Sequence, residues 1–254
     1  MGMAEHLARG VKEAAALLAQ AEYCIALTGA GVSTESGIPD FRSPGSGLWT
    51  RLDPMFFTIE SFKADPAQFY RLGQELFAVI KEAEPNDTHI VLGELEKRGL
   101  VKAIITQNID GLHQKGGARR VLEIHGSLES ASCIGCGCRV SMEGVIGAVL
   151  DGILPPRCSR CGDPLKPDII LFGEAMPPVY QEALLEAEKA DCIMVIGSSM
   201  QVSPANLLPR YSENLIIINR EPTVYDSRAR VVLRGNTAPV MRSLLDELEL
   251  CYGL

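Results

Sequence analysis

The chain has 254 residues, of which 46% are hydrophobic and 22% are charged. This size suits one large domain, or a domain with inserts, that folds around a substantial core. The net charge of −8 disfavours a nucleic-acid-binding protein, because such proteins normally present a basic face. Apolar runs such as Cys192 to Ile196 are shorter than the roughly 20 residues of a membrane span, and Met1 to Arg9 lacks a signal-peptide segment. We therefore expect a cytoplasmic protein with no membrane partner.

Hydrophobic periodicity predicts alternating helices and short strands. Apolar residues recur at helical spacing from Leu7 to Leu18, and an apolar strand is predicted from Tyr23 to Thr28. The capping sequence at Asn86 predicts a second helix that extends to Gly99, followed by a strand from Ala103 to Thr106. The remaining predicted elements are strands at 121–124, 169–172, 192–196, 215–218 and 231–233 and helices at 178–189 and 238–250.

This alternation indicates the fold class. Strands that are apolar on both faces and alternate with helices are typical of an α/β fold with a Rossmann-like doubly wound parallel sheet. Two stretches interrupt the pattern, and we expect them to form a smaller lobe made of a helical insert and a zinc-ribbon insert. The predicted large domain is discontinuous and comprises 1–45, 86–128 and 166–254, whereas the inserts are 46–85 and 129–165.

Four of the eight cysteines form two pairs of identical spacing. Each two-residue gap lets a tight turn aim two sulfurs at one ion, which predicts a tetrahedral zinc site. Four sulfur ligands leave no open coordination position, so the zinc is expected to be structural. Cys138 is an alternative to Cys136 as a ligand. The predicted ligands are Cys133, Cys136, Cys158 and Cys161.

The segment TGAGVSTESGIPDFR at 28–42 begins like a dinucleotide-binding loop and then departs from that pattern. Gly29 and Gly31 match the first two positions of Gly-x-Gly-x-x-Gly, but Thr34 occupies the third. Pro39 would also interrupt a following helix. These departures argue against a dehydrogenase, and we expect the loop to hold a dinucleotide for a reaction other than hydride transfer.

Polar and small residues follow several predicted strands. In an open parallel sheet, ligands bind beyond the carboxyl ends of the strands, so these residues are expected to line one crevice. The segments are 107–110, 125–127, 197–199 and 219–221.

Taken in order, these segments resemble the sirtuin family of NAD-dependent protein deacylases. The matching stretches are 29–42, 107–114, 125–127, the paired cysteines, 166–174, 197–204 and 219–221, and they extend over nearly the whole chain. The resemblance implies a Rossmann-like domain, a small lobe with one structural Zn²⁺, NAD as co-substrate, and an acyl-lysine protein or peptide that enters the cleft between the lobes.

The residue types suit cleavage of the nicotinamide glycosidic bond. Asp110 can accept a hydrogen bond from the carboxamide nitrogen while the Ile109 N–H donates to its oxygen, as these positions do in sirtuins. Phe41 supplies the apolar cover that an oxocarbenium-like sugar needs against water. The predicted cofactor-binding residues are Gly29, Ala30, Gly31, Ser33, Thr34, Asp40, Phe41, Arg42, Gln107, Asn108, Ile109, Asp110, Gly197, Ser198, Ser199, Asn219, Glu221 and Ala238. An acid at Glu221 would select NAD over NADP, although a solvated loop charge is the alternative.

His125 is the candidate general base, because an imidazole pKa of about 6.5 suits removal of a ribose hydroxyl proton near neutral pH. In the sirtuin mechanism the acyl oxygen attacks the anomeric carbon, and the 2′-hydroxyl, activated through His125, attacks the resulting imidate. The implied products are free lysine, nicotinamide and 2′-O-acyl-ADP-ribose. Asn108 is the second predicted catalytic residue, holding ribose hydroxyls or an ordered water, whereas His89 and His113 are expected to be structural.

The predicted substrate-contacting residues are Phe172, Gly173, Glu174 and Val202, from two segments that resemble those between which sirtuins hold a peptide by strand pairing. For Phe172 the alternative is a plain core position. Sirtuins that prefer acidic acyl groups carry Tyr-x-x-Arg in the helical insert. Tyr70 matches the tyrosine, but Gly73 occupies the arginine position, so we expect acetyl or other neutral acyl groups.

Two other functions are compatible with the glycine loop and the cysteine pairs. ADP-ribosyl transfer or NAD hydrolysis could use the same loops. A non-enzymatic zinc-ribbon protein that binds nucleic acid or protein would make Cys133 to Cys161 the active part, and its binding would depend on salt but not on His125.

Overall fold

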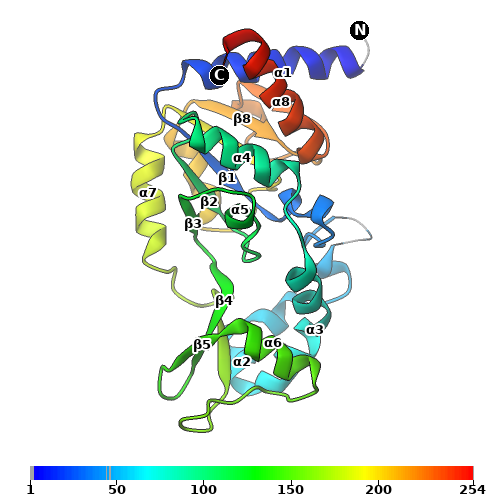
Figure 1. Cartoon of the computed structure of the whole chain (residues 1–254), viewed down its shortest axis with the longest axis vertical. Helices are drawn as coiled ribbons and strands as arrows, with labels where there is room; N and C mark the ends of the chain where they lie inside the picture. The colour runs from blue at the N-terminus through cyan, green and yellow to red at the C-terminus, as the bar shows by residue number, and fades with distance from the viewer. Residues whose placement is uncertain (1–2, 44, 46, 254) are drawn as a thin grey trace.

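The computed structural model describes residues 3–43, 45 and 47–253. Two lobes lie along one axis, with both chain ends on the larger lobe (Figure 1). Residues 1, 2, 44, 46 and 254, which belong to the predicted segments 1–45, 46–85 and 166–254, lie outside the described residues.

The large lobe is built on a six-stranded sheet in the order β3-β2-β1-β7-β8-β9, and every neighbouring pair is parallel. Every residue of β1, β2 and β7 is buried, which explains their continuous apolar runs. The strand order reverses between β1 and β7, so a topological switch point lies at the carboxyl ends of these two strands. The strands are β1 (Cys24–Thr28), β2 (Ala103–Thr106), β3 (Val121–Glu123), β7 (Cys192–Ile196), β8 (Asn214–Ile218) and β9 (Val231–Leu233).

Helices cover both faces of this sheet. On one face, α1 (Met3–Gln20), α4 (Asp87–Lys97) and α8 (Thr237–Tyr252) pack over a core that contains Ile104. On the other face, α7 (Val179–Lys189) covers a core that contains Ile105. Successive strand residues point to opposite faces, so these two isoleucines enter different cores. The doubly wound α/β prediction is confirmed.

The predicted capping sequence at Asn86 is also confirmed. The Asn86 Oδ1 accepts a hydrogen bond from the Thr88 N–H at 2.9 Å, and the His89 Nδ1 accepts one from the Asn86 N–H at 3.2 Å. These bonds satisfy N–H groups that the first turn of α4 would otherwise leave without partners.

The small lobe combines an antiparallel sheet with three helices. The sheet has the order β5-β4-β6 and comprises β4 (Gly126–Cys133), β5 (Arg139–Ser141) and β6 (Leu165–Ile169). Its helices are α2 (Ile59–Ala64), α3 (Pro66–Glu82) and α6 (Met142–Leu150). Phe62 and Tyr70 from the first insert share one core with Val145 and Val149 from the second. The two inserts therefore pack as one unit, to which β4 and β6 connect the large lobe (Figure 1).

The predicted strand at 169–172 is wrong. The chain forms β6 at Leu165–Ile169, and this strand pairs antiparallel with β4 instead of joining the parallel sheet. Ile169 and Leu171 are buried in the small-lobe core, which accounts for the apolar run. A short apolar segment does not by itself reveal which core buries it.

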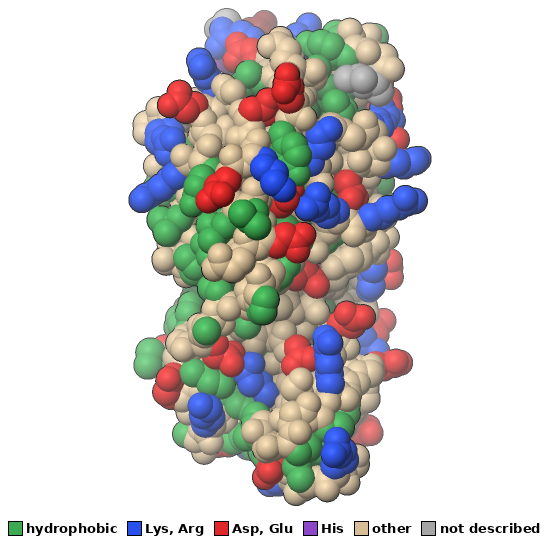
Figure 2. Space-filling model, turned by 90° about the vertical axis from the view of Figure 1, so that its left-hand side faces the viewer, with side chains coloured by type: hydrophobic (Ala, Val, Ile, Leu, Met, Phe, Trp, Pro, Cys, Tyr) green, Lys and Arg blue, Asp and Glu red, His purple; other side chains and the backbone are tan. Residues whose placement is uncertain are grey.

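Shorter elements connect these units. They are α5 (Leu112–Lys115) and the 3₁₀ helices η1 (Ala30–Val32), η2 (Thr34–Ser36), η3 (Leu48–Thr50), η4 (Pro54–Phe57), η5 (Ala205–Tyr211) and η6 (Asp226–Arg228). Within the described part of the chain, no helix is long and apolar enough to cross a membrane. On the face shown in Figure 2, acidic and basic side chains are interspersed over both lobes.

Because both faces of the sheet are covered, Ile104→Ala and Ile105→Ala should each lower the free energy of unfolding by about 2–5 kcal/mol. Ile90→Ala, on the exposed side of α4 where Ile90 is 44% exposed, is the matched control and should change it by less than about 0.5 kcal/mol. Urea denaturation measures all three. A small effect at only one of the two buried positions would contradict coverage of both faces.

Candidate active site

A cavity of about 1420 Å³ lies at the switch point, between the carboxyl ends of the parallel strands and the small lobe. All predicted catalytic and substrate-contacting residues line it, and so do all predicted cofactor-binding residues except Ala238. The backbone N–H of Ala238 instead donates to the Glu35 carboxylate at 2.8 Å, at the start of α8. The polar strand ends found in the sequence therefore converge on one cleft.

The loops after β1 and β7 meet with almost no space between their backbones. The Gly31 N–H donates to the Gly197 carbonyl at 2.8 Å, and a Cβ on Gly31 would lie 2.7 Å from that oxygen. Gly197 has φ +60, and a Cβ there would lie 2.4 Å from the Val32 nitrogen. Only glycine fits both positions. After this contact the chain forms short 3₁₀ turns, and the Thr34 hydroxyl donates to the Gly31 carbonyl at 3.0 Å.

A buried hydrogen-bond chain fixes the polar groups of the cleft floor. The Asn108 Nδ2 donates to Ser33 Oγ at 3.0 Å, and Ser33 Oγ donates to Asp110 Oδ2 at 2.7 Å. The other Asp110 oxygen accepts from the Leu112 N–H at 3.0 Å. Asn108 and Ser33 are 8% and 1% exposed, so the chain holds Asp110 in one orientation at the cleft.

His125 lies between β3 and β4, two residues beyond the end of β3, and its ring Nδ1 lies 3.0 Å from the Gln107 carbonyl oxygen. A carbonyl only accepts, so Nδ1 carries the proton and Nε2 is the basic nitrogen of the neutral ring. Burial lowers the pKa of His125, and the hydrogen bond to Gln107 offsets only part of this effect. His125 therefore meets the requirements for a general base: a neutral ring with a fixed tautomer at the cavity wall.

His89 and His113 lie behind this wall, with their rings 4.9 Å apart in an edge contact. Burial lowers the pKa of His89 to about 4 and that of His113 to about 3, so both rings are neutral. His113 Nε2 lies 2.9 Å from the Thr28 hydroxyl. These contacts fit the structural role expected for both histidines.

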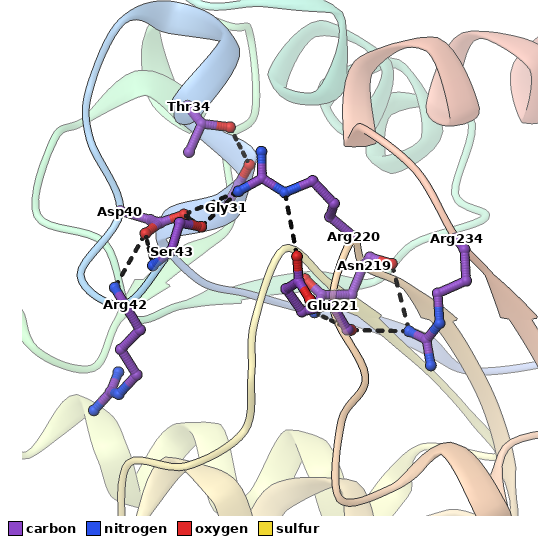
Figure 3. A network of polar contacts seen from close by, with 9 residues as sticks. All are labelled: Gly31, Thr34, Asp40, Arg42, Ser43, Asn219, Arg220, Glu221 and Arg234. Carbon is purple, nitrogen blue, oxygen red and sulfur yellow. Dashed lines mark hydrogen bonds and ion pairs between the residues drawn. The ribbon is translucent and has the colours of Figure 1, made fainter. Parts of the chain in front are cut away.

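Asp40 organises the loop that closes one side of the cleft (Figure 3). Its Oδ1 accepts from the backbone N–H groups of Ser43 at 2.7 Å and Arg42 at 3.0 Å. Arg220, from the end of β8, donates to Ser43 Oγ at 2.5 Å and lies 3.7 Å from Asp40 Oδ2. The Asp40 carboxylate is thus engaged within the loop, whereas the Arg42 guanidinium extends away from it.

Trp49 is a cleft residue that was not predicted from the sequence, whereas Arg220 was expected at the crevice within 219–221 but not as a cofactor ligand. Arg220 lies between the two predicted residues Asn219 and Glu221, and its strand-end position was the available signal. Trp49 stacks on Phe41, with ring centroids 5.0 Å apart, and lies 6.4 Å from the Phe172 ring. Trp49 was harder to predict as a cleft residue, because it lies in an insert and does not follow a strand of the parallel sheet.

Arg234 fixes the backbone beyond β8 (Figure 3). Its Nη1 donates to the Glu221 carbonyl at 2.9 Å, and the Asn219 Nδ2 donates to the same oxygen at 2.7 Å. The Glu221 side chain lies 3.8 Å from the Arg220 Nε and is 60% exposed. Both expectations for Glu221, ribose ligand and solvated charge, remain predictions.

The four predicted zinc ligands converge outside the cleft. Their Sγ atoms all lie within 4.8 Å of one another, with Cys133 and Cys161 3.3 Å apart and Cys136 and Cys158 3.7 Å apart. A tetrahedral zinc with Zn–S bonds of about 2.3 Å places its sulfurs about 3.8 Å apart, so the set fits this ion. Backbone N–H groups of Arg160 and Cys161 lower the pKa of Cys158 to about 6, toward the thiolate that zinc requires.

Cys138 is not part of this group; its Sγ lies 3.9 Å from the Arg139 carbonyl oxygen. The geometry therefore selects Cys136 over Cys138.

Comparison with known proteins identifies the class that this fold and cleft define. The model of the Sir2 family matches residues 29–204, and the chain belongs to this family. The chain is 46% identical to NAD-dependent protein deacetylase 2 of Caldanaerobacter subterraneus subsp. tengcongensis, over 92% of this chain and 94% of that protein. It is 42% identical to the NAD-dependent protein deacetylase of Caldivirga maquilingensis, over 98% and 97%.

Solved structures agree with these relatives. A Sir2–p53 peptide–NAD+ complex superimposes with a TM-score of 0.87 at 36% identity, covering 94% of this chain and 99% of that one. A Sir2 variant with a deacetylated p53 peptide and 3′-O-acetyl ADP ribose superimposes with a TM-score of 0.90 at 36% identity, covering 93% and 98%.

The cysteine geometry predicts different outcomes for two neighbouring substitutions. Cys136→Ser should abolish stoichiometric zinc binding and loosen the small lobe, because a structural zinc supplies folding free energy. Cys138→Ser should retain one zinc per chain. Elemental analysis gives the metal content, and hydrogen exchange of β4 to α6 reports the packing. Zinc loss in Cys138→Ser with retention in Cys136→Ser would reverse the ligand assignment.

Proposed function

We propose that this protein removes acetyl or other neutral acyl groups from protein lysine side chains in an NAD-dependent reaction. The reaction consumes one water, and its products are nicotinamide, 2′-O-acyl-ADP-ribose and free lysine. The carrying observation is that one cleft presents His125 as a fixed neutral base together with the partly buried Ser33–Asp110 contact. The names of the relatives, NAD-dependent protein deacetylases, support the same activity.

NAD supplies a ribose carbon that accepts the acyl oxygen, with nicotinamide as leaving group. In our proposal, Asp110 and the Ile109 N–H hold the carboxamide, and the Ser33 bond keeps the Asp110 carboxylate oriented. Asn108 and Gln107 hold ribose hydroxyls or an ordered water. The stacked rings of Phe41 and Trp49 exclude bulk water from this region.

His125 removes the proton from the ribose 2′-hydroxyl at its Nε2. The Gln107 carbonyl holds the Nδ1 proton, so the base does not need to change tautomer before it acts. Protonation in turn gives an imidazolium whose Nδ1–H still donates to that carbonyl. His125 therefore suits the role of base both because its tautomer is fixed and because its pKa is lowered.

Neutral acyl groups are favoured because Gly73 supplies no charge at the position where sirtuins that prefer acidic acyl groups carry arginine. Gly73 and Phe77 line the cavity, and the charged α3 residues that also line it, Arg71 and Glu75, are opposite in sign. The Tyr70 hydroxyl donates to the Leu165 carbonyl at 2.7 Å, and burial raises the pKa of Tyr70. Its polar group is therefore committed inside the small lobe.

We also propose a cytoplasmic location, because four zinc-binding thiolates persist most readily where thiols stay reduced. Immunoblotting of separated cytosol, membrane and medium tests this location. The acidic balance of the chain and its mixed surface charge favour protein substrates over nucleic acid.

Incubation with an acetyl-lysine peptide and NAD, followed by mass spectrometry, tests the activity. Deacetylated peptide, nicotinamide and acetyl-ADP-ribose should form in equal amounts. His125→Ala should lower the rate about 10²- to 10⁴-fold, the range typical of general-base removal. His6→Ala, at an exposed histidine of α1, is the matched control and should be unaffected. Nicotinamide formation without peptide deacetylation would instead indicate ADP-ribosyl transfer or NAD hydrolysis.

The lowered pKa of His125 predicts the pH dependence of kcat/KM. The neutral ring is the active form, so activity should persist as pH falls to the ordinary imidazole value of about 6.5 and be lost only through a lower pKa. A pH series with a peptide that does not titrate in this range measures the acidic limb. A limb centred above pH 6.5 would contradict the lowered pKa of His125.

A further inference from the structure

The segment 170–174, between β6 and α7, links the two lobes at the cleft. The Ile170 N–H donates to the His125 carbonyl at 2.8 Å, and the Phe172 N–H donates to the Phe57 carbonyl at 3.1 Å. Phe172 is nevertheless 44% exposed, and the next residue is a glycine with φ +88. The Phe172 carbonyl also accepts from the Ile59 N–H at 3.0 Å, whereas the Gly173 N–H and C=O have no hydrogen-bond partner among the described residues, and Gly173 lines the cavity. The segment is thus attached to both lobes and presents the Gly173 backbone for pairing.

An ion pair lies beneath this segment. Lys166 Nζ is 2.9 Å from Glu174 Oε2, and the two side chains are only 13% and 23% exposed. Lys166 Nζ also donates to the Ile169 carbonyl at 2.7 Å and the Pro167 carbonyl at 3.2 Å. Three acceptors surround the three ammonium protons, so the lysine is fully engaged.

Glu174 is engaged in the same way. The oxygen that meets Lys166 also accepts from the Leu171 N–H at 2.8 Å, and the Glu174 N–H donates to the Leu171 carbonyl at 3.1 Å. These bonds close a turn around Phe172 and Gly173. Glu174 is predicted from the sequence to contact substrate, and in the structure its carboxylate is bonded within the protein.

We infer that Lys166 and Glu174 are positioning residues that preset the segment 170–174 for the acyl-lysine peptide. The inference rests on the proposed deacylase function. Recognition by strand pairing requires backbone N–H and C=O groups that are already in place, because ordering a loop on binding weakens affinity. The ion pair joins β6, which the small-lobe sheet holds, to the far end of the turn and so fixes both ends.

The pair should act on the peptide and not on NAD. The loops after β1, β7 and β8 belong to the large lobe, and no described hydrogen bond or ion pair joins them to Lys166 or Glu174. Removal of one partner leaves the other charge unpaired in a largely buried site, which favours opening of the turn toward solvent. The KM for peptide should therefore rise while kcat and the KM for NAD change little.

Steady-state kinetics of Lys166→Met and Glu174→Gln, with an acetyl-lysine peptide and NAD varied separately, test the inference. Each variant should raise the peptide KM at least about tenfold, with kcat and the NAD KM within about threefold of wild type. Lys166→Arg, which can keep the ion pair, should restore the peptide KM. Arg139→Met is the matched control: it removes a more exposed ion pair of the same sheet, to Asp168, and should leave the peptide KM unchanged.

Anisotropy of a labelled acetyl-lysine peptide gives a second readout that does not depend on turnover, and zinc content and melting temperature report on folding. The Lys166→Met, Glu174→Leu double variant should weaken peptide binding no more than Lys166→Met alone, since the two groups act as a pair.

A peptide KM within twofold of wild type in both single variants would overturn the inference. Equal losses for peptide and NAD, loss of zinc, or failure of both single variants to fold would also overturn it, because the pair would then support the whole lobe and not the segment. A wild-type protein without deacetylase activity refutes the proposed function instead. In that case the peptide affinities measured by anisotropy still test the role of Lys166 and Glu174.

Discussion

The close backbone contact between the loops after β1 and β7 is the constraint on which the cleft depends. Parallel strands that neighbour each other at a switch point send their following loops in opposite directions, which opens a crevice between them. Here the crevice floor closes through the hydrogen bond from Gly31 to Gly197, at positions where any Cβ would collide with backbone. That contact places Ser33 beside Asn108 and Asp110, and the buried polar chain follows from it.

The same constraint explains why the glycine loop differs from a hydride-transfer fingerprint. A third glycine serves close packing of a long helix on the sheet, but here the chain turns through two short 3₁₀ helices toward the small lobe. The loop therefore delivers Asp40, whose carboxylate organises the turn, and Phe41, whose ring stacks on Trp49. Arg220 joins this turn to the end of β8 across the cleft (Figure 3).

The small lobe has to be rigid without a large core, because it is built from two inserts. A shared aromatic core around Phe62 and Tyr70 joins these inserts, and the cysteine cluster holds the β4 side of the lobe. β4 and β6 connect this lobe to the cleft, where the segment 170–174 is hydrogen-bonded to the His125 carbonyl and to the helical insert. The catalytic base and the proposed peptide site therefore have a common mechanical support.

The sequence by itself determined the parallel α/β class, the cysteine pairs and the strand-end residues, because each depends on local periodicity or spacing. Buried strands are apolar throughout, and zinc knuckles need a two-residue gap between their cysteines. It did not determine that the apolar run at 169–172 enters the small-lobe core, or that Cys136 and not Cys138 joins the cysteine cluster. Nor did it determine that the carboxylates of Asp40 and Glu174 bind other groups of the protein. These outcomes depend on which distant segments meet. Arg220 reaches Ser43, and Lys166 reaches Glu174, only after the strands are ordered and the inserts are packed. The tertiary structure decided them because hydrogen bonds and ion pairs act over a few ångströms in space, and separation along the chain does not encode that distance.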